Sequence, residues 1–147
     1  MRWPQRRHCL VTVVVLDTSV YVSALVFGGV PRVAVERALA SPLRIAVSAE
    51  LKAELVATLE RKFGWSSIQV SRACGHLWEG AMWCEPVPVQ ASRDPNDDHV
   101  LGCALAASAG VILTGDKDLL SLHPFRGIAI LTPAAFLALP SEGRRDR

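Results

Sequence analysis

Acidic side chains occur at a few places in this chain. Six of the seven aspartates lie directly after an apolar stretch or in the loop that follows one: Asp17, Asp94, Asp97, Asp98, Asp116 and Asp118. Few Lys or Arg residues are interleaved with them, so the carboxylates would repel one another wherever the fold brings them together. A divalent cation relieves such repulsion, and ligands that offer only oxygen select Mg²⁺ or Mn²⁺. A metal held by several acids activates water and stabilises charge on phosphate, so the pattern indicates phosphodiester hydrolysis.

The first of these acids follows an apolar run. Residues 11–16 (VTVVVL) are mostly β-branched, which predicts a strand buried on both faces of a parallel sheet. A lone carboxylate is costly inside such a strand, so we expect Asp17 at the strand's carboxyl end. Open α/β sheets bind their ligands at that edge. The alternative is that Asp17 only caps the following helix.

Strands and helices alternate along the rest of the chain. Further strands are expected at 43–47, 86–89, 111–114 and 128–131. Helices are expected at 20–27, 31–40, 49–62, 66–83, 99–109 and 133–139. The alternation predicts a three-layer α/β/α fold with a mainly parallel sheet of about five strands. Because parallel strands end at one edge, the acids converge there, and Glu54 joins them from the second turn of its helix.

Local structure offers other uses for several acids. Asp97 or Asp98 is suited to cap the helix that follows. Asp94 lies in a stretch of turn composition, and Asp118 can cap a short helix. The carboxylates with the strongest claim to a site are Asp17, Glu54, one of Asp97 and Asp98, and Asp116.

Composition indicates one globular domain at residues 11–139. Half of the 147 residues are hydrophobic and a fifth are charged. Residues 1–10 form a basic extension and residues 140–147 a flexible basic tail. Residues 9–139 contain 10 basic and 12 acidic residues, a net charge of −2, so the overall +2 comes from the ends. The ends could hold a polyanion or simply aid solubility.

A cytoplasmic protein is expected. No apolar run approaches the roughly 20 residues of a membrane span, and no signal-peptide cleavage site follows the basic start. The cysteines are widely spaced without metal-binding spacing, which favours buried, reduced thiols: Cys9, Cys74, Cys84 and Cys103. We place the last three of them in helices.

At these residues the chain resembles the PIN-domain family, and within it the toxins of toxin–antitoxin systems (VapC-like ribonucleases). The matching stretches are VVLDTSVYVSAL (14–25), SAELKAELVATL (48–59), RDPNDDHVLGCALAA (93–107), VILTGDKDLL (111–120) and ILTPAAFL (130–137). They occur in the family's order and span nearly the whole domain. The resemblance rests on the set, because an aspartate after one apolar run is a weak signal.

The resemblance implies a Mg²⁺ or Mn²⁺ centre with endoribonuclease activity. Asp17 and Asp116 would be direct ligands, Asp98 a third acid, and Glu54 a ligand directly or through water. We choose Asp98 over the adjacent Asp97 because three apolar residues then lie at i+3, i+6 and i+7, on the helix face toward the sheet: Leu101, Ala104 and Leu105.

Hydroxyl groups complete the expected site. Thr18 and Ser19 orient the carboxylate of Asp17, and Ser19 stands where the family often has Asn. Thr114 is the small polar residue that usually precedes the fourth acid, and Asp118 extends the site.

The sequence therefore favours a divalent-metal-dependent endoribonuclease, the toxin of a type II toxin–antitoxin pair, with RNA as substrate and an antitoxin as partner. One alternative is a PIN-like module that binds RNA or protein with weak catalysis or none. The other is a haloacid-dehalogenase-like phosphatase, which needs a second Asp where this chain has Ser19. The apolar residues 20–27 and the Trp-bearing helices are compatible with a homodimer.

Overall fold

A five-stranded parallel sheet forms the centre of the protein. The computed structural model describes residues 12–140, so the expected extension at 1–10 and nearly all of the tail at 140–147 lie outside the described residues. The strands are β1 (Thr12–Leu16), β2 (Leu43–Val47), β3 (Met82–Trp83), β4 (Val111–Leu113) and β5 (Ala129–Leu131). Their order is β3-β2-β1-β4-β5, and every neighbouring pair is parallel. The predicted α/β fold is confirmed.

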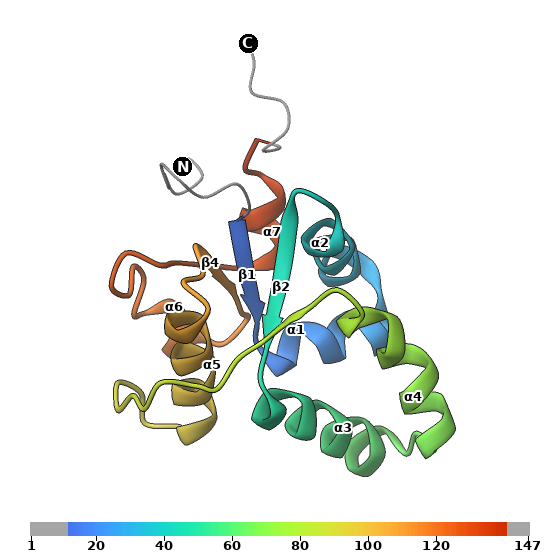
Figure 1. Ribbon diagram of the computed structural model, residues 1–147. Helices are drawn as coiled ribbons and strands as arrows, with labels where there is room; N and C mark the ends of the chain where they lie inside the picture. The colour runs from blue at the N-terminus through green and yellow to red at the C-terminus, as the bar shows by residue number, and fades with distance from the viewer. Residues whose placement is uncertain (1–11, 141–147) are drawn as a thin grey trace.

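Helices cover both faces of this sheet. They are α1 (Thr18–Val22), continued by a π-helical turn (Ser23–Phe27), α2 (Gly29–Leu39), α3 (Ala49–Phe63), α4 (Ser67–Gly75), a 3₁₀ turn (His76–Trp78), α5 (Pro95–Ala106), α6 (Lys117–Leu120) and α7 (Pro133–Leu137). In Figure 1, α5 lies on one side of β1 and β2, and α1 and α2 lie on the other. Strands β1 and β2 end side by side, where α1 and α3 begin.

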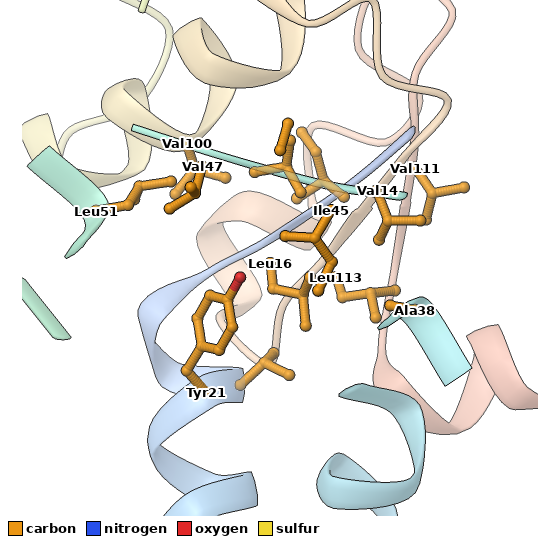
Figure 2. Packing of buried hydrophobic residues seen from close by; sticks show 14 of the residues in the cluster. Val14, Leu16, Tyr21, Ala38, Ile45, Val47, Leu51, Val100, Val111 and Leu113 are labelled. Atoms are coloured by element: carbon orange, nitrogen blue, oxygen red, sulfur yellow. The ribbon is translucent and has the colours of Figure 1, made fainter. Parts of the chain in front are cut away.

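The core explains why these runs form strands. Val14 and Leu16 of β1 lie beside Ile45 of β2 and Leu113 of β4 on one face of the sheet, as the register requires. Tyr21 packs among them from α1 (Figure 2), and all five side chains are buried. Because both faces are covered, the strands are mainly apolar instead of alternating, although Arg44 of β2 is exposed.

The expected third strand at 86–89 is wrong. The edge strand is β3, whose Met82 pairs with Ala46 of β2. Residues 86–89 instead lie against α5, where the N–H of Val87 donates to the carbonyl oxygen of Gly102 at 3.1 Å. Pro86 and Pro88 have no N–H to donate to a sheet, which accounts for the error.

Two expected helices have different bounds. The helix expected at 66–83 ends at Gly75 as α4, with a capping box between Ser66 and Gln69 at its start. The helix expected at 99–109 begins earlier, because Asp94 caps it and Pro95 occupies its first turn.

Cys74 and Cys103 are buried free thiols, as expected. Cys84 is half-buried and follows β3 instead of lying in a helix. Cys9 lies outside the described residues.

Across residues 12–140, no single helix is long and apolar enough to cross a membrane. The bent pair Thr18–Phe27 and Gly29–Leu39, at 115° to each other, passes that test together on length and composition alone.

Candidate metal centre

Asp17, at the carboxyl end of β1, lines an acidic pocket. Its backbone N–H donates to the carbonyl oxygen of Leu113 at 2.9 Å, which extends the β1–β4 pairing to this residue. The carboxylate Oδ2 accepts the hydroxyls of Thr114 at 2.8 Å and of Ser19 at 3.0 Å. Asp17 occupies the N-cap position of α1, yet its side chain makes no capping hydrogen bond there. Capping therefore does not explain this carboxylate.

Thr114 connects Asp17 to the acid that follows β4. Its buried hydroxyl donates to Asp17 and accepts the backbone N–H of Asp116 at 2.9 Å. Asp116 in turn begins α6, with Oδ1 accepting the N–H of Asp118 at 3.0 Å. One hydroxyl thus fixes two acids from neighbouring strands.

Helix α3 supplies Glu54. The helix begins where the hydroxyl of Ser48 accepts the N–H of Leu51, and its apolar stripe includes the buried Leu55. On the next face, the Oε1 of Glu54 accepts the hydroxyl of Thr18 at 3.1 Å. The first turn of α1 therefore holds Glu54 toward the pocket that Asp17 lines.

The two adjacent aspartates of α5 point to different places. Asp97 is 3% exposed, lines the pocket, and accepts the hydroxyl of Ser92 at 2.9 Å. Asp98 lies outside it, and its Oδ1 accepts the backbone N–H groups of Ala91 and Ser92 at 3.0 and 2.9 Å. Asp98 thus holds the loop before the helix in place. Asp97 occupies the position in the pocket that was expected for Asp98. This differs from the choice made on the sequence.

The pocket has a volume of about 400 Å³. It is lined by Asp17, Thr18, Ser19, Val22, Ser23, Glu54, Thr58, Lys62, Phe63, Asp94, Asn96, Asp97 and Asp116. One carboxylate oxygen each from Asp97, Asp116 and Asp118 lie within 4.8 Å of one another. The structure therefore brings together the other predicted acids and leaves Asp98 aside. Asp94 is at the rim, where its Oδ1 caps α5 by accepting the N–H of Asn96.

Burial makes the negative charge of Asp17 and Glu54 unfavourable. It raises the pKa of Asp17, while the hydroxyls of Thr114 and Ser19 oppose the shift and the charge of Asp116 adds to it. Burial also raises the pKa of Glu54. The hydrogen bond from Thr18 opposes this shift, and the negative charges of Asp17 and Asp94 add to it.

Asp97 shows the largest effect within the pocket. Its burial raises the pKa to about 6, the hydroxyl of Ser92 opposes this shift, and the negative charges of Asp116 and Asp94 reinforce it. Carboxylates with pKa values raised in this way are stabilised by a cation.

The donor set fits a hard divalent cation. Within residues 12–140, the pocket offers oxygen donors and one Lys, with no His or Cys in its lining. The hydrogen bonds above use a single oxygen of each acid: Oδ2 of Asp17, Oε1 of Glu54, Oδ2 of Asp97 and Oδ1 of Asp116. The second oxygen of each can turn to an ion. Such a set suits Mg²⁺ or Mn²⁺ rather than Zn²⁺.

Sequence reasoning missed Ser92. It lies in the loop before α5, and its hydroxyl holds the most buried acid of the pocket. No pattern in the sequence marks it, because its role depends on how the loop 91–94 turns back toward α5.

The fold and the site together define a parallel α/β domain with an acidic pocket at the carboxyl ends of its strands. Residues 13–118 match the sequence profile of the PIN domain, so the chain belongs to the PIN-domain family. This assignment supersedes the phosphatase alternative. A comparison with curated proteins finds no significant match.

Solved structures with the same fold are distant in sequence. PAE2754 from Pyrobaculum aerophilum is 15% identical with a TM-score of 0.58, over 86% of this chain and 88% of that one. VapBC-1 from nontypeable Haemophilus influenzae is 18% identical with a TM-score of 0.57, over 84% and 99%. VapBC2 from Rickettsia felis, bound to a DNA fragment from their promoter, is 14% identical with a TM-score of 0.53, over 81% and 97%.

Proposed function

We propose that this protein is a divalent-metal-dependent endoribonuclease that acts in the cytoplasm as the toxin of a type II toxin–antitoxin pair. The observation that carries the proposal is the Asp97 carboxylate, 3% exposed among other acids in a pocket without His or Cys. Such a group needs a cation, and a cation held by acids is suited to phosphodiester hydrolysis. Membership of the PIN-domain family supports the same reaction.

We assign the binding of Mg²⁺ or Mn²⁺ to Asp17, Glu54, Asp97 and Asp116, with Asp118 beside them. When bound, the ion supplies Lewis-acid activation of water and neutralises charge on the phosphate. The chain's own hydroxyls keep the acids in place: Thr114 holds Asp17. Thr18 likewise holds Glu54 through its hydroxyl.

An antitoxin is the proposed protein partner. Two of the solved structures that share this fold are VapBC toxin–antitoxin complexes, and this likeness supports the proposal. A homodimer remains a prediction. That prediction rests partly on residues 20–27, which pack mainly in the core, since Val20 and Ala24 are buried. Phe27, the last residue of that segment, is 75% exposed, and α2 adds the exposed apolar side chains of Val30 (49%) and Val33 (51%).

Cleavage of RNA by the purified full chain tests the proposal. We expect hydrolysis of single-stranded RNA with Mg²⁺ or Mn²⁺, and none with EDTA. Asp17→Asn and Asp97→Asn should each lower the rate by at least a hundredfold, because each removes a charge that holds the ion. Asp98→Asn is the matched control and should stay close to the wild-type rate. Equal cleavage by the wild type and Asp17→Asn would reject the site.

Binding of RNA without cleavage would instead favour the module that lacks catalysis. In that case metal addition should leave the RNA intact while RNA still binds.

A further inference from the structure

The acidic pocket continues into a basic and aromatic surface that the proposed metal site does not use. A second hollow of about 430 Å³ shares four lining residues with the pocket: Glu54, Thr58, Lys62 and Asn96. Arg61 lines the second hollow and Phe63 lines the first. We call Arg61, Lys62, Phe63 and the neighbouring Phe27 the basic–aromatic rim.

Helical spacing along α3 explains the position of the cations. Glu54, Thr58 and Lys62 follow one another at intervals of four residues, so they form one stripe that leads out of the pocket. Arg61 lies at i+7 from Glu54 and flanks the stripe. Within residues 12–140 the one ion pair joins Arg32 and Glu36, so neither rim cation is held in an ion pair. Both cations are exposed and can reach a phosphate.

Two phenylalanines extend the same rim. Phe27, at the end of the π-helical turn after α1, is 75% exposed. Its ring meets that of Phe63 edge to face, with centroids 6.0 Å apart and planes at 80°. One ring therefore holds the other in place beside Lys62 and leaves a large apolar surface open to solvent.

We propose that the basic–aromatic rim binds a single-stranded nucleotide next to the scissile phosphate of the RNA. Lys62 and Arg61 contact a neighbouring phosphate, and an unpaired base stacks on Phe27. Cations beside aromatic rings are the usual means of binding single strands without reading their sequence. The acids of the pocket repel phosphates, so cations at its edge are needed to guide the strand past them. A duplex hides the faces of its bases, which makes the rim selective for unpaired RNA. This inference rests on the proposed function.

Binding can be measured apart from cleavage in an Asp97→Asn background. Fluorescence anisotropy of a labelled single-stranded RNA gives the Kd as a function of salt. Removing both cations (Arg61→Ala with Lys62→Ala) should raise the Kd roughly tenfold and lower the slope of log Kd against log salt by about 1.4, or about 0.7 for each charge. Phe27→Ser should raise the Kd by roughly 5- to 100-fold for single-stranded RNA and leave duplex RNA unchanged.

Matched variants control for charge and for exposed apolar surface. Lys52→Ala with Arg72→Ala removes the same charge elsewhere, and Ile68→Ser removes another exposed apolar side chain, 63% exposed on α4. Both should leave the Kd within about twofold. If the rim variants behave like these controls, or if Phe27→Ser weakens duplex binding equally, the proposal is wrong.

Cleavage by the same rim variants in the wild-type background separates this inference from the proposed function. We expect KM to rise while kcat stays within about threefold. Weakened binding by the rim variants, with no cleavage by the wild type, would support the rim and reject the nuclease. Normal cleavage with an unchanged KM and Kd would reject the rim alone.

Discussion

Replacing Asp97 by Asn should stabilise the metal-free protein and abolish its response to metal. Burial and neighbouring acids raise the pKa of Asp97 to about 6, compared with 3.8 for an ordinary aspartate. At 1.36 kcal/mol per pKa unit, that difference corresponds to roughly 3 kcal/mol lost to the buried charge at neutral pH. The pocket is open to water, which screens part of this cost. We therefore expect a gain of about 1–2 kcal/mol, or a rise in Tm of about 2–8 °C.

Thermal unfolding in EDTA and in excess Mg²⁺ measures both effects. A ligand present at a hundred times its Kd stabilises the folded state by about 2.7 kcal/mol, so Mg²⁺ should raise the Tm of the wild type. The Tm of Asp97→Asn should be higher than that of the wild type in EDTA and should not respond to Mg²⁺.

At the adjacent position, Asp98→Asn should change the stability in the opposite direction. The carboxylate of Asp98 accepts the N–H groups of Ala91 and Ser92, and an amide oxygen is a weaker acceptor. This variant should lose about 1 kcal/mol with and without metal and should keep its response to Mg²⁺. A lower Tm for Asp97→Asn in EDTA, or a lost Mg²⁺ response in Asp98→Asn, would refute the assignment of these two acids.

Three other outcomes are expected. Because the pKa of Asp97 is raised in the folded protein, the metal-free protein should lose stability as pH rises from about 4 through 6. Denaturant titrations at several pH values measure this trend. Stability that rises with pH over this range would mean that the acid is paired with a cation. Thr114→Val removes a donor to Asp17 and should weaken Mg²⁺ binding by roughly 10- to 100-fold in calorimetry, and unchanged affinity would contradict the role of the hydroxyl. Gly102→Ala would place a Cβ against the carbonyl oxygen of Val87 and should cost about 1–3 kcal/mol in chemical unfolding, whereas a neutral result would mean that the segment 84–90 moves freely.

The strands at the centre of the sheet could be predicted because burial on both faces leaves a plain signal. Residues 12–16 and 43–47 are mainly apolar runs, and they pair in parallel as expected. The edge strand β3 is only two residues long, and its position is set by pairing with Ala46 and Val47 of β2. Its own sequence therefore carries little information. Pairing partners, not the local sequence, define it.

The structure places Asp97 in the pocket and Asp98 outside it, and the sequence could not distinguish the two for a related reason. Periodicity could separate the two acids only if α5 had one clear apolar face, yet Val100, Leu101 and Cys103 are all buried. A helix that is apolar nearly all around has no face that periodicity can identify. In the structure the residues at i+3 and i+4 from Asp97 are the buried Val100 and Leu101, which turns this acid inward with them.

Capping and ion binding turn out to be compatible uses of the same carboxylates. The carboxyl ends of parallel strands are also the places where helices begin, so the pocket receives the N-termini of α1, α5 and α6 together. Asp116 gives one oxygen to the N–H of Asp118, which completes the first turn of α6, and its second oxygen can turn to the pocket. The partial positive charge of each helix start lowers the cost of gathering the acids but does not neutralise them. Asp116→Asn would therefore keep the cap and the fold, because an amide oxygen can accept the same N–H, while removing the charge that holds the ion. A stable but inactive Asp116→Asn variant would separate the two uses.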